Sequence, residues 1–113
     1  MKLQIEGQNL RVRINEDELA RLLAGEPVVA RTRFASAFAV SCTLRLGAGE
    51  PACFGGQPDA WLVEIPEAAV RDHAARLPTR EGLSFVLPGD EGDALELLFD
   101  VDVRDSVRHR RSR

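Results

Sequence analysis

The chain has 113 residues and a mass of 12.4 kDa, which is enough for one domain with its own hydrophobic core. Apolar residues make up 44% of the sequence and charged residues 29%, and this composition argues against a disordered, collagen-like or fibrous protein. No apolar run approaches the ~20 residues that a membrane span needs, and the first residues lack the apolar stretch of a signal peptide. The sequence therefore predicts a cytoplasmic protein.

The net charge of −3 is distributed unevenly along the chain. Residues 104–113 carry five arginines and one aspartate, whereas residues 1–103 carry 10 basic and 17 acidic side chains. An acidic body repels phosphate backbones, so we expect no nucleic-acid binding except weak contacts through the tail Arg104–Arg113. We expect residues 1–103 to form a single α+β domain and residues 104–113 to form a basic, flexible tail. The only lysine among 15 basic residues is Lys2, a bias typical of a GC-rich bacterial genome.

The N-terminal third predicts a hairpin followed by a helix. Two alternating segments flank a turn at residues 7–9, and their inward row is Leu3, Ile5, Leu10, Val12 and Ile14. Asn15 followed by Glu18 is a capping-box pattern, which predicts that a helix begins there. Gly25 ends this helix at a position that favours a left-handed residue.

The rest of the chain predicts further strands and one more helix. Residues 28–34 and 38–46 alternate as strands, and the inward row of the second is Phe38, Val40, Cys42, Leu44 and Leu46. Residues 47–59 hold four glycines and two prolines, and within them residues 52–54 are expected to add a short strand. Strands are also expected over residues 61–65, 83–87 and 94–103, and a second helix over residues 66–77, which Pro78 ends.

The element order is therefore ββ-α-βββ(β)-α-ββ. Short hairpins joined by tight turns favour antiparallel pairing, and only two helices are available to cover the sheet. The sequence predicts an α+β fold: a twisted antiparallel sheet or a partly closed barrel of six to eight strands with two helices.

Alternating arginines are the most conspicuous polar feature. They stand opposite the aliphatic rows at Arg11, Arg13, Arg31 and Arg33, with Arg45 on a third strand. One interpretation is a small-anion site in which these arginines bind phosphate or carboxylate through bidentate hydrogen bonds. The alternative is a solvated sheet face with cross-strand ion pairs to acids such as Glu96, Asp100 and Asp102. The similar numbers of positive and negative charges favour the second interpretation.

Neither a thiol site nor a metal site has a motif in the sequence. Cys42 and Cys53 are eleven residues apart without a CxxC pattern, and we expect both to be free thiols. Thiol catalysis would use Cys53 with His73 as its base, but no basic neighbour in the sequence activates this thiol. His73 lies at the edge of the apolar stripe of the second helix, which is typical of a structural histidine. Spacings that bind zinc, calcium or nucleotide phosphates are absent, so no metal or cofactor is predicted.

The order of these patterns resembles a small bacterial family of unknown function. The resemblance rests on the hairpin ending Leu-Arg-Val-Arg-Ile with its Glu/Leu helix in residues 1–23, the segment Ala30–Phe34, the strand Trp61–Ile65 with Pro66 after it, and the strand Leu95–Asp102. Members of that family often carry a Glu-Lys-Asp-Phe run and a nearby cysteine on the last strand, where this chain has Phe99-Asp100-Val101-Asp102 and no cysteine. The resemblance implies no activity, cofactor or catalytic residue.

Taken together, these patterns predict a non-enzymatic protein-interaction or structural module. Its partner is another protein or a second copy of the chain, bound through an exposed strand edge or through residues 47–59. The alternative is a small-anion binding protein that uses Arg11, Arg13, Arg31 and Arg33. A thiol enzyme centred on Cys53 is the third hypothesis.

Overall fold

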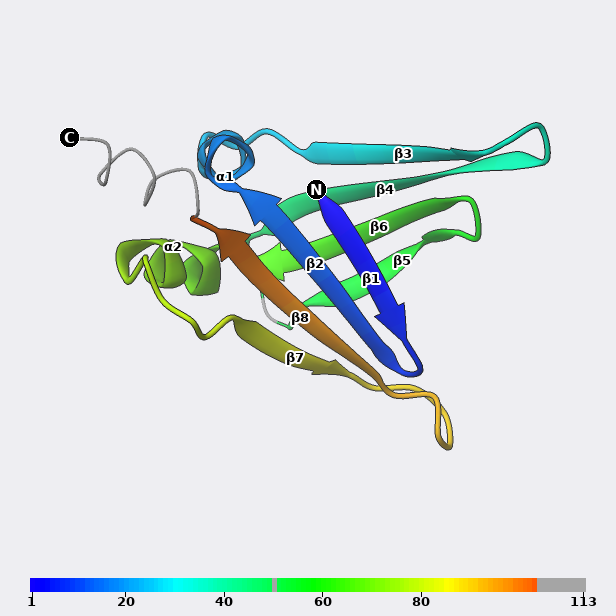
Figure 1. Cartoon of the computed structure of the whole chain (residues 1–113). Coiled ribbons are helices and arrows are strands. Elements are labelled where there is room, and N and C mark those ends of the chain that lie inside the picture. Colours follow the sequence, from blue (N-terminus) through cyan, green and yellow to red (C-terminus); the bar gives the residue numbers. More distant parts are fainter. Residues whose placement is uncertain (50, 104–113) are drawn as a thin grey trace.

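A computed structural model describes residues 1–49 and 51–103 and contains two four-stranded sheets with two helices (Figure 1). Sheet I consists, in spatial order, of β1 (Lys2–Glu6), β2 (Asn9–Asn15), β8 (Leu95–Asp102) and β7 (Leu83–Leu87). Sheet II consists of β3 (Val28–Phe34), β4 (Phe38–Gly47), β6 (Ala60–Pro66) and β5 (Cys53–Gln57). The helices are α1 (Glu16–Leu23) and α2 (Glu67–Ala75).

The α+β class and the two helices are confirmed, but the expected single antiparallel sheet or partly closed barrel is wrong. In each sheet the two central strands run parallel, β2 beside β8 and β4 beside β6, and an antiparallel hairpin partner flanks each of them. In sheet I the chain passes from β2 through α1, sheet II and α2 before it returns to β7 and β8, whereas in sheet II β5 lies between β4 and its parallel partner β6. Parallel neighbours cannot be joined by a tight turn, and alternation within a strand reveals only which face is buried.

The order hairpin, helix, hairpin occurs twice along the chain, as β1-β2-α1-β3-β4 and as β5-β6-α2-β7-β8. Each sheet joins one hairpin from each half. The central strand pairs of the two sheets have the same register. Arg13 of β2 faces Asp100 of β8, and Glu64 of β6 faces Arg45 of β4. Arg13 is therefore equivalent to Glu64, and Asp100 is equivalent to Arg45. The paired strand positions of one half therefore have equivalents in the other, and these can be compared within one molecule.

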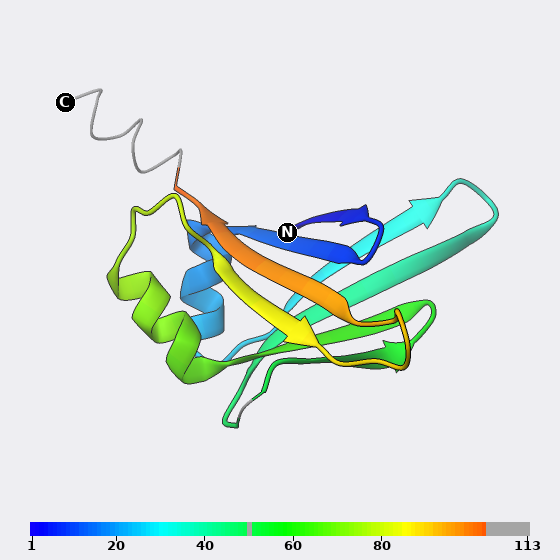
Figure 2. The ribbon, with the colours of Figure 1, turned by 90° about the horizontal axis from the view of Figure 1, so that it is seen from below.

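The helices and the hairpin turns lie at opposite ends of the molecule. Both helices lie at the left of Figure 1, the four hairpin turns lie at the right, and the β3–β4 hairpin extends beyond the turns of sheet I in both views (Figure 1 and Figure 2). Core residues from both sheets and both helices pack together; those without measurable exposure include Val12, Leu44, Val63, Val70 and Phe99. We call the helical end the closed end and the end with the hairpin turns the open end.

Helix α1 begins as the sequence predicts. The side chain of Asn15 accepts a hydrogen bond from the backbone N–H of Glu18 at 2.8 Å, and the Glu18 side chain accepts one from the backbone N–H of Asn15 at 3.0 Å. The amino group of Met1 also donates to Glu18, at 2.7 Å. Helix α2 begins after Pro66 without a side-chain cap, and it ends at Ala75, two residues before the predicted end.

The inward rows are buried on the central strands but fail on the edge strand β1 and at the tip of the β3–β4 hairpin. Leu10, Val12 and Ile14 are buried, but Ile5 in the same predicted row is 63% exposed. Phe38 is likewise exposed although Cys42 on the same strand is buried. Ile5 faces the buried Leu10 across β1–β2, so its exposure follows from its place on the edge strand, whereas Phe38 lies at the tip of its hairpin.

Candidate functional site

The arginines of β2 share one carboxylate. Arg11 donates to Asp100 Oδ2 through Nε at 3.2 Å and through Nη2 at 2.5 Å. Arg13 donates from Nε to Oδ1 and from Nη2 to Oδ2, both at 3.3 Å. Both arginines therefore have a partner on the outer face of sheet I, in a cross-strand arrangement typical of a solvated sheet face.

Arg31 and Arg33 lie on β3, in the other sheet. Within residues 1–49 and 51–103 neither side chain makes a hydrogen bond or an ion pair. Both line an open hollow of about 760 Å³, together with Ser41, Asp59 and apolar residues of β4 and β6. The four predicted ligand-binding arginines are thus divided into two pairs on different sheets, one paired with an acid and one not.

The remaining arginine of the sequence prediction also has an acidic partner. Arg45 Nε donates to Glu64 Oε2 at 2.8 Å. Glu64 occupies the position equivalent to Arg13, and Arg45 the position equivalent to Asp100, so the acid and the base have exchanged strands between the two sheets. The same carboxylate lies 3.8 Å from the Cys53 sulfur, so the exposed thiol donates to an acid.

Neither cysteine has a histidine beside it among the contacts of the described residues. Cys42 is buried in the core, as predicted, and burial raises the pKa of its thiol. His73 is only 2% exposed and packs edge-on against Phe99, with 6.3 Å between the ring centroids. Burial, followed by the charge of Arg76, lowers the pKa of His73 against the opposing effects of Asp100 and Asp72. This histidine packs in the core, and its position does not offer Cys53 a base.

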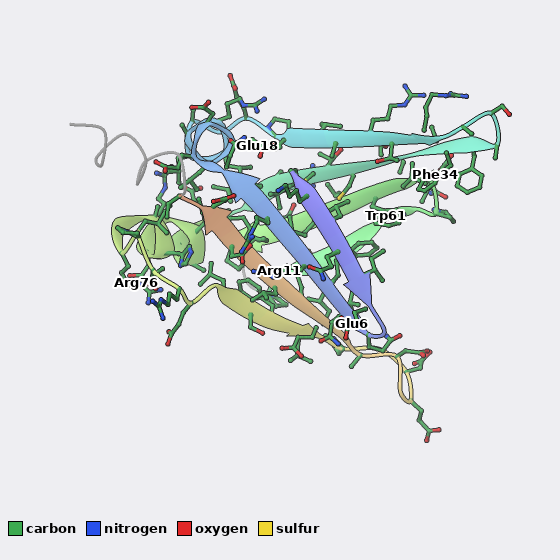
Figure 3. The ribbon with its side chains drawn as sticks, in the orientation of Figure 1. Glu6, Arg11, Glu18, Phe34, Trp61 and Arg76 are labelled. Carbon is green, nitrogen blue, oxygen red and sulfur yellow. The ribbon has the colours of Figure 1, made fainter. Side chains whose placement is uncertain are left out.

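The open end exposes aromatic side chains on the inner face of sheet II. Phe34 is 50% exposed and Phe38 is 59% exposed, and their ring centroids are 5.1 Å apart. Phe54 and Trp61 form a second pair at 5.9 Å, and Trp61 Nε1 donates to the carbonyl of Pro58 at 2.8 Å. We call Phe34, Phe38, Phe54 and Trp61 the aromatic shelf. In Figure 3, Phe34 lies near the tip of the β3–β4 hairpin, far from Arg11 on sheet I.

The sequence interpretation missed this shelf because it expected Phe38, in an inward row, to be buried; Phe38 lies on that inner face but is exposed. A signal was present, since Phe34 and Phe38 flank a turn of three small residues at the end of two strands. Aromatic residues at the tip of a hairpin lie far from the helices that cover the core.

Two smaller hollows combine both charge signs. One, of about 250 Å³ on the outer face of sheet I, contains Arg11 with two glutamates; its charged lining is Glu6, Arg11 and Glu96. The other, of about 340 Å³ beside the two helices, is lined by Glu26, Arg45, Glu67 and Arg71. In each the arginines already have carboxylate partners.

In the part of the chain that the structure describes, no group of three or more histidine, cysteine, aspartate or glutamate side chains is placed to hold a metal ion. No helix in this part is long and apolar enough to cross a membrane. The predicted basic tail, residues 104–113, lies outside the described residues.

Neither the family models nor the curated proteins contain a match to this chain. The resemblance to a bacterial family of unknown function stays a prediction, and the proposals for function rest on the geometry.

Proposed function

We propose that the protein is a non-enzymatic interaction module that binds a segment of another protein on the aromatic shelf. The observation that carries this proposal is the exposure of the shelf: Phe34 and Phe38 leave half or more of their surface in water. Exposed aromatic side chains are typical of protein-binding surfaces, where aromatic residues contribute much of the binding energy.

The surrounding charges indicate the chemistry of the partner. The turns of sheet I point to the same open end as the shelf (Figure 1), and they carry acids: Glu6 before the β1–β2 turn, then Asp90, Glu91 and Asp93 in the β7–β8 turn. Arg31 and Arg33 line a hollow with the shelf residue Phe38, so the shelf lies between basic side chains of β3 and the acids of these turns. Charges of both signs attract a segment that carries both acidic and basic residues beside its apolar anchors. We therefore propose a partner segment of mixed charge with aromatic or aliphatic anchors.

A peptide selection on the full chain tests this function. We expect a random peptide library displayed on phage to yield sequences with aromatic or aliphatic residues next to charged residues of both signs. Synthetic versions of these peptides are expected to lose at least tenfold in affinity for the double variant Phe34→Ser/Phe38→Ser. Val29→Ser is the matched control, because Val29 is 60% exposed on the same sheet but on its outer face. Peptides that bind both variants as tightly as the wild type would contradict the proposal.

A second candidate function is the binding of a small anion by Arg31 and Arg33. It is supported by the lack of acid partners for these two side chains among the described residues and by the hydroxyl of Ser41 in the same hollow. A ligand that binds only the native state raises the melting temperature. At constant ionic strength, a saturable rise with phosphate, citrate or a nucleotide is expected in the wild type and in Arg76→Gln, but not in Arg31→Gln/Arg33→Gln. If no anion of such a panel raises the melting temperature, this candidate function is excluded.

A further inference from the structure

β7 is an edge strand of sheet I with no residue that opposes pairing. Its sequence is Leu83-Ser84-Phe85-Val86-Leu87, without charge, glycine or proline. β8 occupies one side of β7, and no described residue pairs with the other side. Val86 points to the outer face and is 71% exposed, more than any other large apolar side chain described. Unprotected edges of this kind pair readily with another strand.

The other three edge strands each contain residues that hinder pairing. β1 carries Lys2 and Glu6, β3 carries Arg31 and Arg33, and β5 contains two adjacent glycines. Charges and glycines on an edge discourage the addition of a strand. Among the edges that the structure describes, β7 is therefore the one best suited to pairing.

The edge strands β7 and β3 occupy equivalent places in the two halves of the molecule, so their residues can be compared position by position. Val86 faces Glu96 across β7–β8, and Arg31 faces Ser41 across β3–β4. These positions are equivalent because Glu96 and Ser41 occupy matching places on the parallel central strands. The same edge position thus carries a charge on β3 and an exposed valine on β7.

We propose that β7 pairs antiparallel with β7 of a second copy of the chain, about a twofold axis at Phe85. This register places Leu83 opposite the partner's Leu87 and Ser84 opposite the partner's Val86. All inward residues stay on the inner face, and the two copies of sheet I become one continuous eight-stranded sheet. The surface differs from the aromatic shelf, so this inference goes beyond the proposed function and does not depend on it.

Charges beyond the strand ends favour the same register. Arg80 lies three residues before β7 and Asp90 three residues after it, and both are exposed. The twofold axis brings Arg80 toward the partner's Asp90, and the partner's Arg80 toward Asp90. Glu81, the other charge close to the N-terminal end of β7, lies opposite the partner's Gly89. The register therefore creates two opposite-charge contacts without a direct contact between like charges.

The self-association of the full chain tests this inference. A five-residue strand gives a small interface, so we expect a weak dimer that forms between about 10 µM and 1 mM in sedimentation equilibrium. Val86→Arg, which copies the equivalent residue of β3, is expected to stay monomeric over this range. Val29→Arg, on an exposed valine of the other edge, and Phe34→Ser/Phe38→Ser, on the shelf, are expected to dimerise like the wild type.

Two results would overturn the inference. One is a wild type that is monomeric at about 1 mM, and the other is a dimer that Val86→Arg leaves intact while a shelf or β3 variant abolishes it. In the second case self-association uses the shelf or the β3 edge, according to which variant abolishes it; this excludes β7 and does not contradict peptide binding on the shelf.

A charge exchange tests the register itself. Arg80→Glu alone and Asp90→Arg alone each place like charges across the axis, so each is expected to weaken dimerisation several-fold. A mixture of the two variants restores opposite charges at both contacts and is expected to form mixed dimers as tightly as the wild type. If the mixture associates no better than either variant alone, the proposed register is wrong.

Discussion

Asp100 is the residue that holds the two arginines of β2. Its side chain is 15% exposed, whereas those of Arg11 and Arg13 are 38% and 34% exposed. A carboxylate in this position accepts charge-assisted hydrogen bonds from both guanidinium groups, which are stronger than neutral hydrogen bonds.

Asp100→Asn is therefore expected to lower the free energy of unfolding by about 1–3 kcal/mol. Glu64→Gln is the matched control, because Glu64 occupies the place equivalent to Arg13 and pairs with a single, half-exposed arginine. Glu64→Gln is expected to lower the free energy of unfolding by less than about 1 kcal/mol. Urea unfolding measures the free energy of unfolding of both variants. Equal losses in the two variants would show that the shared carboxylate has no special part in stability.

His73 makes stability depend on pH. Burial and the charge of Arg76 lower its pKa below the usual 6.5, despite the nearby Asp100 and Asp72. The unfolded chain then binds the proton more readily than the folded one, so the free energy of unfolding falls as the pH drops below about 6.5.

His73→Leu removes this titration with little change in volume, and Leu22 occupies the equivalent position of α1. We expect the loss of stability between pH 7 and pH 5.5, measured by urea unfolding at each pH, to be smaller in the variant. A variant as sensitive to pH as the wild type in this window would assign the dependence to other groups.

At the scale of elements, the two helices begin differently. α1 has a complete capping box, whereas α2 follows Pro66 with no side-chain hydrogen bond at its start. The first turn of α1 also carries Glu16, Asp17 and Glu18, where the helix dipole favours negative charge. The start of α1 thus depends on local side chains, and the start of α2 depends on packing.

Asn15→Ala is expected to lower the free energy of unfolding by about 1 kcal/mol, because the backbone N–H of Glu18 loses its acceptor. Asn15→Ser keeps a capping oxygen and is expected to stay close to the wild type in thermal and urea unfolding. An equal loss in both variants would mean that the capping hydrogen bond is not the cause.

At the scale of the whole molecule, the contrast between central and edge strands governs stability. Ile14 is 1% exposed and Ile5 is 63% exposed, although both belong to the same predicted row of sheet I. Ile14 lies on the central strand β2, whereas Ile5 lies on the edge strand β1 opposite Leu10, which is itself buried.

Ile14→Ala is therefore expected to lower the free energy of unfolding by about 2–5 kcal/mol, because it removes buried apolar surface and leaves a cavity. Ile5→Ala is the same chemical change on the same face, and it is expected to lower the free energy of unfolding by about 0.5 kcal/mol. Urea unfolding of the two variants compares the central and the edge strand directly. A loss for Ile5→Ala that approaches the loss for Ile14→Ala would mean that β1 is covered in solution.

Local patterns predicted much of the secondary structure. The capping box, the strand containing Cys53 and the buried rows around Val12 and Phe99 follow from side-chain chemistry and spacing within a few residues. The candidate site was predicted less well, because Arg13 and Asp100 are 87 residues apart in sequence and meet only through the parallel β2–β8 pair. Alternation places a side chain on a face, but it does not identify the strand beside it.

The sequence by itself determined the α+β composition, the beginning of α1 and the face of each strand on which its apolar side chains lie. Only the tertiary structure decided that there are two sheets, that the two arginine pairs belong to different sheets, and that the aromatic shelf is exposed. The physical reason is the range of the forces involved. Capping and alternation act between residues close in the chain, whereas strand partners and burial depend on how distant segments pack together.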